Sequence, residues 1–194
     1  MEFSNIVKGQ VTQTLVKTLF EESGYRVERL GIEELIRDVK KLDKESYKAL
    51  SLPNSLRKIP DLFITDACMD NAWLVEVKYR RRLDKRNTQS LCKVLQNQYA
   101  FWPDTYVILI NGDSIDEKKH QDIIRVVTPS SFEKMPNQLK YKRPSFYWYS
   151  EPLHKVFSEF EWRNSNGHKN SINADSIAVS VVKYLTSLDE VSSF

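Results

Sequence analysis

The sequence contains few of the residues on which many catalytic and metal-binding sites depend. It has two cysteines, Cys68 and Cys92, and three histidines, His120, His154 and His168. The cysteines do not have the spacing of metal ligands and suggest no disulfide framework, so we expect reduced thiols. The histidines are far apart and match no ligand pattern. A glycine-rich phosphate loop, a Ser or Cys catalytic triad and a zinc cluster are also missing from the sequence.

Long apolar runs and a strong net charge are missing too. No run approaches the roughly 20 residues that a membrane helix needs. The amino-terminal segment lacks the order of regions typical of a signal peptide, so we expect a cytoplasmic protein with no membrane partner. The net charge is only +3, and a nucleic-acid-binding surface would therefore have to come from local clusters. The length of 194 residues suits one globular domain.

The hydrophobic pattern predicts an α/β fold, in which helices flank a mixed sheet. Apolar residues at helical spacing predict helices, and alternating or continuous apolar runs predict strands. The strand at 105–110 is apolar almost throughout, which indicates burial on both faces. We expect helices at about 6–20, 33–50, 88–101 and 176–188, and strands at about 25–31, 59–65, 72–79, 105–110 and 123–128.

The chain divides into a core and an extension. We expect the core to span 1–128, with an inserted helix at about 32–56, and residues 129–194 to form a C-terminal extension packed on it. The extension is rich in aromatic residues from Phe146 to Trp162. These could stack on the bases of a single-stranded nucleic acid, but core packing or an oligomer interface is the favoured alternative.

Both strands of the predicted hairpin carry an acidic residue. If Thr65 pairs with Ala72, then Asp61 lies directly opposite Glu76, with Cβ atoms about 5 Å apart. Side chains alternate along a strand, so Lys78 shares the face of Glu76. Two carboxylates this close repel each other unless a cation lies between them. Lys78 is one candidate, and a divalent metal ion is a better one.

A hard cation such as Mg²⁺ or Mn²⁺ binds carboxylate oxygens, waters and phosphate. It can turn a bound water into a nucleophile against a phosphodiester. The hairpin offers the carboxylates of Asp61 and Glu76 and the backbone carbonyl of Val77 as ligands, and the ammonium of Lys78 to assist the water. A solvated strand face or a simple cross-strand ion pair explains the same pattern equally well.

Pro60 and Asp61, followed by Glu76, Val77 and Lys78, resemble the motif of the PD-(D/E)xK nuclease superfamily. The order of helix, strand, hairpin, helix and strand around them is similar as well. The resemblance implies a restriction endonuclease-like core and Mg²⁺-dependent cleavage of DNA. It implies that Asp61, Glu76 and the Val77 carbonyl bind the metal and that Lys78 acts on the attacking water.

The similarity extends from roughly Gly9 to Val127. The first helix resembles that of archaeal Holliday junction resolvases, which often carry an acid four residues after a glycine. This chain has Gln13 at that position. The change removes a carboxylate and leaves a second metal site open to question, but glutamine can still bind a metal or its water. Gln13 therefore stays among the catalytic candidates.

A basic segment follows the second strand of the hairpin. Phosphates that flank a cleaved bond would need cations at this place, although a solvated loop is the alternative. On the next helix, Gln96 fits the distance from Lys78 better than Gln89 for a side chain that faces the site, but plain helix surface is the favoured alternative for both. The predicted nucleic-acid contacts are Arg80, Arg81, Arg82, Lys85, Arg86 and Gln96.

The sequence thus predicts a Mg²⁺-dependent deoxyribonuclease. One rival is a weakly active or inactive DNA-binding or assembly module on the same fold, in which the acids only pair with Lys78. Another is a partner-binding or toxin-like protein that acts through its aromatic segment. The sequence leaves open the form of the substrate (duplex, branched or single-stranded DNA, or RNA), the cutting specificity and the choice between endonuclease and exonuclease. A homodimer is one option, because nucleases that cut both strands are frequently dimers.

Overall fold

The computed structural model describes residues 2–81, 84–112, 123–132, 150–157, 180–185 and 187. Much of the predicted extension lies outside these residues, including most of its aromatic segment and part of the helix expected at 176–188. Among the described residues, no helix is both long enough and apolar enough to cross a bilayer.

Within the described ranges, six strands form one open, mixed sheet. They are β1 (Arg26–Arg29), β2 (Leu62–Thr65), β3 (Ala72–Arg80), β4 (Thr105–Asn111), β5 (Ile124–Val127) and β6 (Glu151–Pro152), and they lie in the sheet in this order. Only β3 and β4 run parallel, and all other neighbours are antiparallel. A parallel pair needs a crossover connection, which α5 (Lys85–Tyr99) supplies. The five strands expected from the sequence are confirmed, with ends that differ by a few residues.

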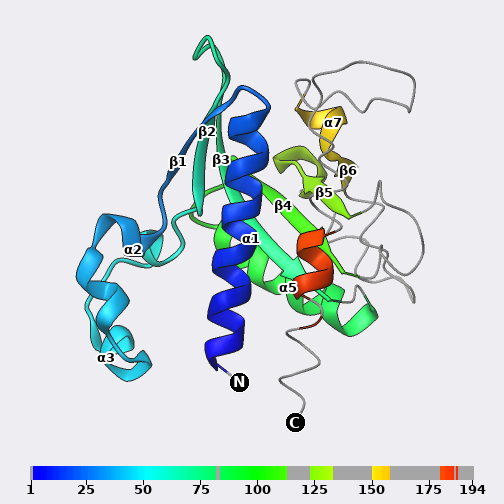
Figure 1. Cartoon of the computed structure of the whole chain (residues 1–194). Coiled ribbons are helices and arrows are strands. Elements are labelled where there is room, and N and C mark those ends of the chain that lie inside the picture. The colour runs from blue at the N-terminus through cyan, green and yellow to red at the C-terminus, as the bar shows by residue number, and fades with distance from the viewer. Residues whose placement is uncertain are drawn as a thin grey trace.

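Two long helices cover opposite faces of the sheet (Figure 1). Helix α1 (Glu2–Glu22) packs Leu15, Val16, Leu19 and Phe20 against one face. Helix α5 packs on the other face through a separate apolar cluster. The α/β sandwich predicted from the sequence is confirmed.

The two faces of β3 and β4 have different partners. Val75, Val77, Ile108 and Ile110 face α1, and Val107 and Leu109 face Leu91, Leu95 and Tyr99. The residues of β4 from Val107 to Ile110 are 0% exposed. Strand β4 is thus buried on both sides, as its continuous apolar run indicated.

The inserted segment between β1 and β2 is not one helix, so the helix predicted over 33–50 is wrong. It consists of α2 (Ile32–Leu35), the 3-10 helix η1 (Arg37–Lys41), α3 (Lys44–Ala49) and α4 (Asn54–Arg57). These elements form a lobe beside the β1 edge (Figure 1). Helical geometry breaks at Ile36 and at the extended residue Leu42. The side chain of Asp43 then accepts a hydrogen bond from the Ser46 amide and starts a new helix.

The hairpin has the predicted register, with Thr65 paired to Ala72 and Leu62 paired to Val75. Asp66 holds its turn, because its carboxylate accepts hydrogen bonds from the backbone amides of Asp70 (2.8 Å) and Asn71 (3.1 Å). A register slip of one residue would exchange the two faces of β3. The turn therefore helps to decide which side chains of β3 face α5.

In the C-terminal part, α7 (Leu153–Val156) follows β6. The next residue, Phe157, is buried and packs against Phe20 and Trp73, with ring centroids 4.8 and 5.3 Å apart. At this residue of the aromatic segment, core packing is confirmed.

Candidate active site

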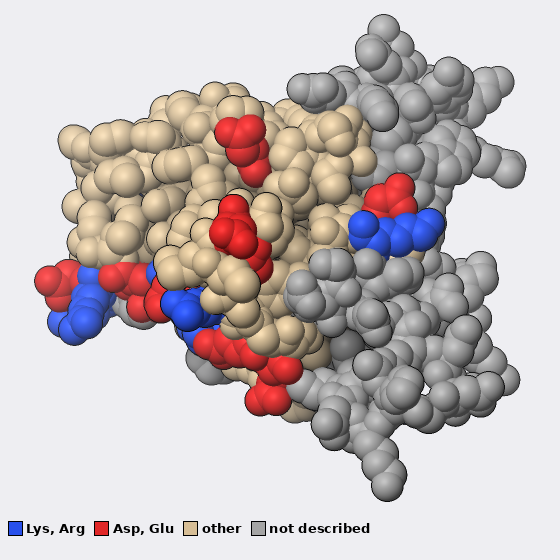
Figure 2. Space-filling model, turned by 90° about the horizontal axis from the view of Figure 1, so that it is seen from above, with Lys and Arg blue, Asp and Glu red and all other residues tan. Residues whose placement is uncertain are grey.

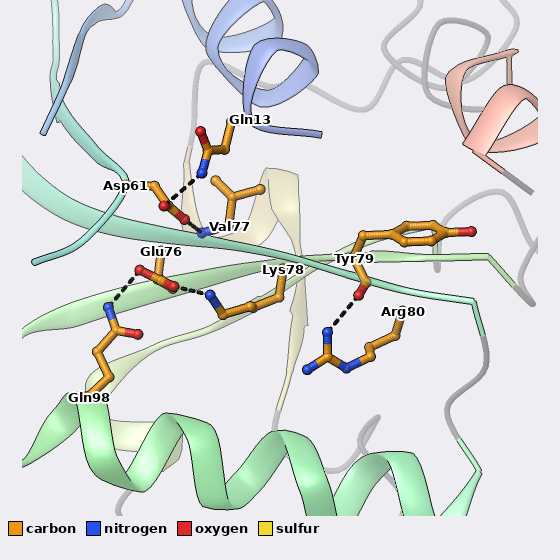
Figure 3. A network of polar contacts seen from close by, with 8 residues as sticks. All are labelled: Gln13, Asp61, Glu76, Val77, Lys78, Tyr79, Arg80 and Gln98. Carbon is orange, nitrogen blue, oxygen red and sulfur yellow. Dashed lines mark hydrogen bonds and ion pairs between the residues drawn. The ribbon is translucent and has the colours of Figure 1, made fainter. Parts of the chain in front are cut away.

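Asp61 lies at a bend immediately before β2. Its Oδ2 accepts a hydrogen bond of 2.7 Å from the backbone N–H of Val77, and its Oδ1 accepts one of 2.8 Å from Nε2 of Gln13 on α1 (Figure 3). The backbone pairing of β2 with β3 ends at Leu62 and Val75. The Asp61 carboxylate therefore replaces a strand partner for the Val77 amide. Because strand amides point along the plane of the sheet, the carboxylate lies at the level of the sheet, beneath α1.

Glu76 lies on the α5 side of β3 (Figure 3). It is only 6% exposed. Its Oε1 pairs with the ammonium of Lys78, and its Oε2 accepts a hydrogen bond of 2.7 Å from Nε2 of Gln98 on α5. A buried carboxylate needs such donors, because burial without them is costly.

The register that brings Asp61 opposite Glu76 is confirmed, but the expected common face is not formed. Asp61 turns its carboxylate towards α1, and Glu76 turns its carboxylate towards α5. The reason is the bend at Asp61, which frees this residue from the alternation of the strand. The charge of Glu76 still reaches Asp61 and raises its pKa.

Burial is the largest influence on the ionisable groups of the site. Burial, followed by the charge of Glu76, raises the pKa of Asp61 to about 7, although Lys78 and the Val77 amide act in the opposite direction. Burial lowers the pKa of Lys78, but the charges of Glu76 and Asp61 outweigh it and raise this pKa above its usual value. Lys78 is therefore an ammonium ion at neutral pH and acts as a hydrogen-bond donor.

A third acid, Glu33 of the inserted lobe, lies within electrostatic reach of Asp61, and the sequence pattern did not indicate it. The amide of Leu30 donates a hydrogen bond of 2.9 Å to the carbonyl of Asp61. The Glu33 carboxylate folds back over the adjoining Gly31, with Oε2 3.2 Å from the point that a Cβ on this glycine would occupy. Its charge also raises the pKa of Asp61. The only signal in the sequence was an acidic first turn after the first strand.

Gln98 is the α5 glutamine that contacts Glu76, and Gln96 lies on the exposed helix surface, as the favoured alternative indicated. Gln98 is 4% exposed and bonds to Glu76, whereas Gln96 is exposed. The buried residues Leu91 and Leu95 lie seven and three positions before Gln98, which puts all three on one helix face. This spacing could have identified Gln98 from the sequence.

The described residues of the basic segment differ in burial. Arg80 is half-buried on the α5 side of β3, and its Nη1 donates a hydrogen bond of 2.8 Å to the carbonyl of Tyr79 (Figure 3). Arg81 is half-buried, and Arg86 is exposed in the first turn of α5. Arg82 and the side chain of Lys85 lie outside the described residues. Figure 2 shows scattered charges and no continuous basic patch over the described part of the face that it presents.

The donors at the site suit a hard divalent cation, which prefers oxygen ligands. The carbonyl of Arg80 accepts a hydrogen bond from the amide of Gly112, so the backbone groups of Arg80 point to the β4 side. The backbone groups of successive residues in a strand point alternately to the two neighbouring strands. The amide and the carbonyl of Val77 therefore both point to the β2 side, where Asp61 lies. Burial and then the charge of Glu76 raise the pKa of Asp61 to about 7, and a bound cation would favour its charged form. Among the described residues, no group of three His, Cys, Asp or Glu side chains could hold a metal.

No protein-family model matches the chain, and no curated protein or solved structure matches it. Its function therefore has to be inferred from the arrangement of its own residues.

Proposed function

We propose that this chain is a metal-dependent nuclease with a restriction endonuclease-like core, and that it hydrolyses phosphodiester bonds of DNA. The observation that carries the proposal is the contact between Asp61 and the Val77 amide. It links the acid before β2 to the strand segment that carries Glu76 and Lys78. Two carboxylates and one ammonium from distant parts of the sequence thereby come within electrostatic reach of one another, with Asp61 turned towards α1 and Glu76 turned towards α5.

The order of elements supports the same proposal. Helix α1, strand β1, the β2–β3 hairpin, helix α5 and strand β4 follow one another as the resemblance implies, with the lobe of short helices inserted before β2. Strands β5 and β6 extend the sheet beyond β4. The fold alone does not decide function, so the site has to carry the proposal.

A divalent cation, when bound by Asp61, Glu76 and the Val77 carbonyl, would supply a more acidic water and neutralise charge on the phosphate. The chain's own residues provide the setting for that chemistry. Gln13 of α1 donates a hydrogen bond to Asp61, and Gln98 of α5 donates one to Glu76 from the other face of the sheet. Lys78, an ammonium at neutral pH, can donate to the attacking water or to a phosphate oxygen, where it stabilises developing negative charge.

A cleavage assay tests the proposal. Purified protein should cut at least one of duplex, branched or single-stranded DNA in the presence of Mg²⁺ or Mn²⁺ and not in EDTA. Asp61→Asn, Glu76→Gln and Lys78→Ala should each lower the rate by about 100-fold or more, with far-UV circular dichroism unchanged. Asp38→Asn, at an acid whose side chain is 85% exposed, is the matched control and should cut like the wild type. Cleavage that persists in all three variants would rule out these residues as the catalytic centre.

One observation favours a second candidate, an inactive nucleic-acid-binding module. Helix α1 contributes the amide of Gln13 and no acid, and each oxygen of Asp61 and Glu76 already accepts a hydrogen bond from the protein. On this view the acids serve only the fold. Wild-type protein that binds DNA but never cuts it, with either metal ion, would support the second candidate over the first.

A further inference from the structure

The alternation of β3 places Arg80 on the same face of the strand as Glu76 and Lys78. Its side chain lies on the α5 side of the strand, together with Glu76 and Lys78 (Figure 3). Its charge is close enough to Lys78 to lower the pKa of that ammonium, although the two carboxylates outweigh this effect. Arg80 and Lys78 are therefore two neighbouring cations at the same site.

The guanidinium of Arg80 has no acidic partner within the described part of the chain. Its contact there is the carbonyl of the preceding residue, Tyr79. Burial lowers the pKa of Arg80, which shows that its charge is partly removed from water. A half-buried cation beside a second cation is unfavourable unless an anion joins them. A guanidinium carries five N–H donors, so among the described residues the contact with one carbonyl leaves most of its donors for such an anion.

We propose that Arg80 binds the phosphate that is cleaved, an inference that rests on the proposed nuclease function. Two non-bridging oxygens of a phosphodiester match the planar fork of a guanidinium, which binds phosphate in a bidentate manner. A bound divalent cation would offset the charges of Asp61 and Glu76. Lys78 and Arg80 then face the substrate as two positive charges.

This pair of charges suits the transition state better than the substrate. A phosphodiester carries one negative charge, and attack by hydroxide adds a second one while the P–O bond to the leaving oxygen breaks. The leaving oxygen departs with the electron pair of that bond and accepts a proton from solvent. A second cation next to Lys78 therefore stabilises the transition state more than the ground state, and it contributes mainly to kcat.

The test compares Arg80→Gln with Arg26→Gln, a matched control at an exposed arginine of β1. With the DNA that the wild type cuts, we expect Arg80→Gln to lower kcat by about 100-fold and to change KM much less. Mn²⁺ affinity measured by calorimetry should stay within about threefold of the wild-type value, because Arg80 is not a metal ligand. Arg26→Gln should match the wild type in all three quantities. Arg80→Lys keeps the charge but loses the planar fork of the guanidinium. Its kcat should lie between the values of Arg80→Gln and the wild type.

Three results would overturn the inference. One is a kcat of Arg80→Gln near the wild-type value, and another is a parallel loss of Mn²⁺ binding, which would indicate a structural role. The third result applies if Arg80→Gln does not fold: a kcat of Arg80→Lys equal to the wild-type value would then contradict the inference. If the wild type itself cuts no DNA, the nuclease proposal fails separately. Binding of inorganic phosphate in the presence of Mn²⁺ then tests whether Arg80 binds phosphate. This binding should be lost in Arg80→Gln and kept in Arg26→Gln. Equal binding by both variants would contradict the inference.

Discussion

The carboxylate of Asp61 accepts a hydrogen bond of 2.7 Å from the backbone amide of Val77, the residue between Glu76 and Lys78. This contact joins the end of the inserted lobe to β3, the second strand of the hairpin. It also holds a buried acid next to a second one, so the protonation of Asp61, the binding of a cation and the stability of the hairpin should depend on one another.

The first prediction concerns pH. The pKa of Asp61 is raised from 3.8 to about 7, so the folded protein binds a proton that the unfolded chain releases. Without metal, stability should be highest below about pH 4 with respect to this group and should fall as the pH rises towards 7. The upper limit of the loss is about 4 kcal/mol. Urea unfolding in EDTA at several pH values measures it, and Asp61→Asn should remove this fall. An identical pH dependence in wild type and variant would contradict the assignment.

A second prediction concerns Gln13. Gln13→Glu places a carboxylate where an amide now donates to Asp61. Without metal the two acids would repel each other and lower stability, whereas a divalent cation would gain a ligand. We expect Mn²⁺ to bind about tenfold more tightly by calorimetry and the metal-free variant to melt at a lower temperature. Gln10→Glu, at an exposed position on the same helix, is the control and should do neither. Unchanged Mn²⁺ affinity in Gln13→Glu would show that this side chain lies too far from the cation.

A third prediction separates two glutamines of α5. Gln98→Leu removes the donor to the buried Glu76 and should cost about 1–3 kcal/mol in free energy of unfolding. Gln96→Leu changes an exposed side chain and should stay within about 0.5 kcal/mol of the wild type. Urea denaturation of both variants at one pH makes the comparison. Equal effects would mean that the bond from Gln98 to Glu76 does not contribute to stability.

A fourth prediction tests Glu33. Its charge raises the pKa of Asp61, so Glu33→Gln should move the pH midpoint of the stability change to lower pH. Removal of a nearby negative charge should also weaken Mn²⁺ binding by a few-fold. Glu45→Gln, an exposed acid in the first turn of α3, is the control. The same midpoint for Glu33→Gln and the wild type would place Glu33 outside the electrostatic reach of Asp61.

The last prediction concerns the end of β4. A Cβ added to Gly112 would lie 2.8 Å from the carbonyl oxygen of Arg81, so Gly112→Ala must displace the chain just after Arg80. We expect a loss of about 1–3 kcal/mol in the free energy of unfolding. Gly9→Ala is the control, because a Cβ on Gly9 meets no atom within 4 Å and alanine favours the helix. The free energy of unfolding of Gly9→Ala should rise by up to about 1 kcal/mol. An unchanged free energy of unfolding in Gly112→Ala would show that the backbones at Gly112 and Arg81 can separate.

The sequence predicted the features that depend on strand periodicity. The alternation along 72–79 and the polar turn before it were sufficient for the pairing of Thr65 with Ala72, and thus for the register of Asp61 and Glu76. The direction of the Asp61 carboxylate could not be predicted in this way. It depends on a bend outside the strand and on a backbone amide of β3 that β2 leaves without a partner.

The contributions from the helices were harder to predict. Gln98 follows from the buried positions of α5 only once the helix face is fixed by Leu91 and Leu95. Glu33 reaches the site because Leu30 bonds to the Asp61 carbonyl, a tertiary contact without a local sequence signal. The break of the predicted helix at Leu42 and Asp43 likewise depends on a capping contact that amphipathic spacing does not report.

The most direct test of the central claim is diffraction from crystals soaked in Mn²⁺, with anomalous data collected at the manganese edge. We expect a peak within coordination distance of the carboxylates of Asp61 and Glu76 and of the Val77 carbonyl, and no peak in Asp61→Asn crystals soaked in the same way. A wild-type map without manganese at these oxygens, from crystals that bind it elsewhere, would contradict the proposed metal centre.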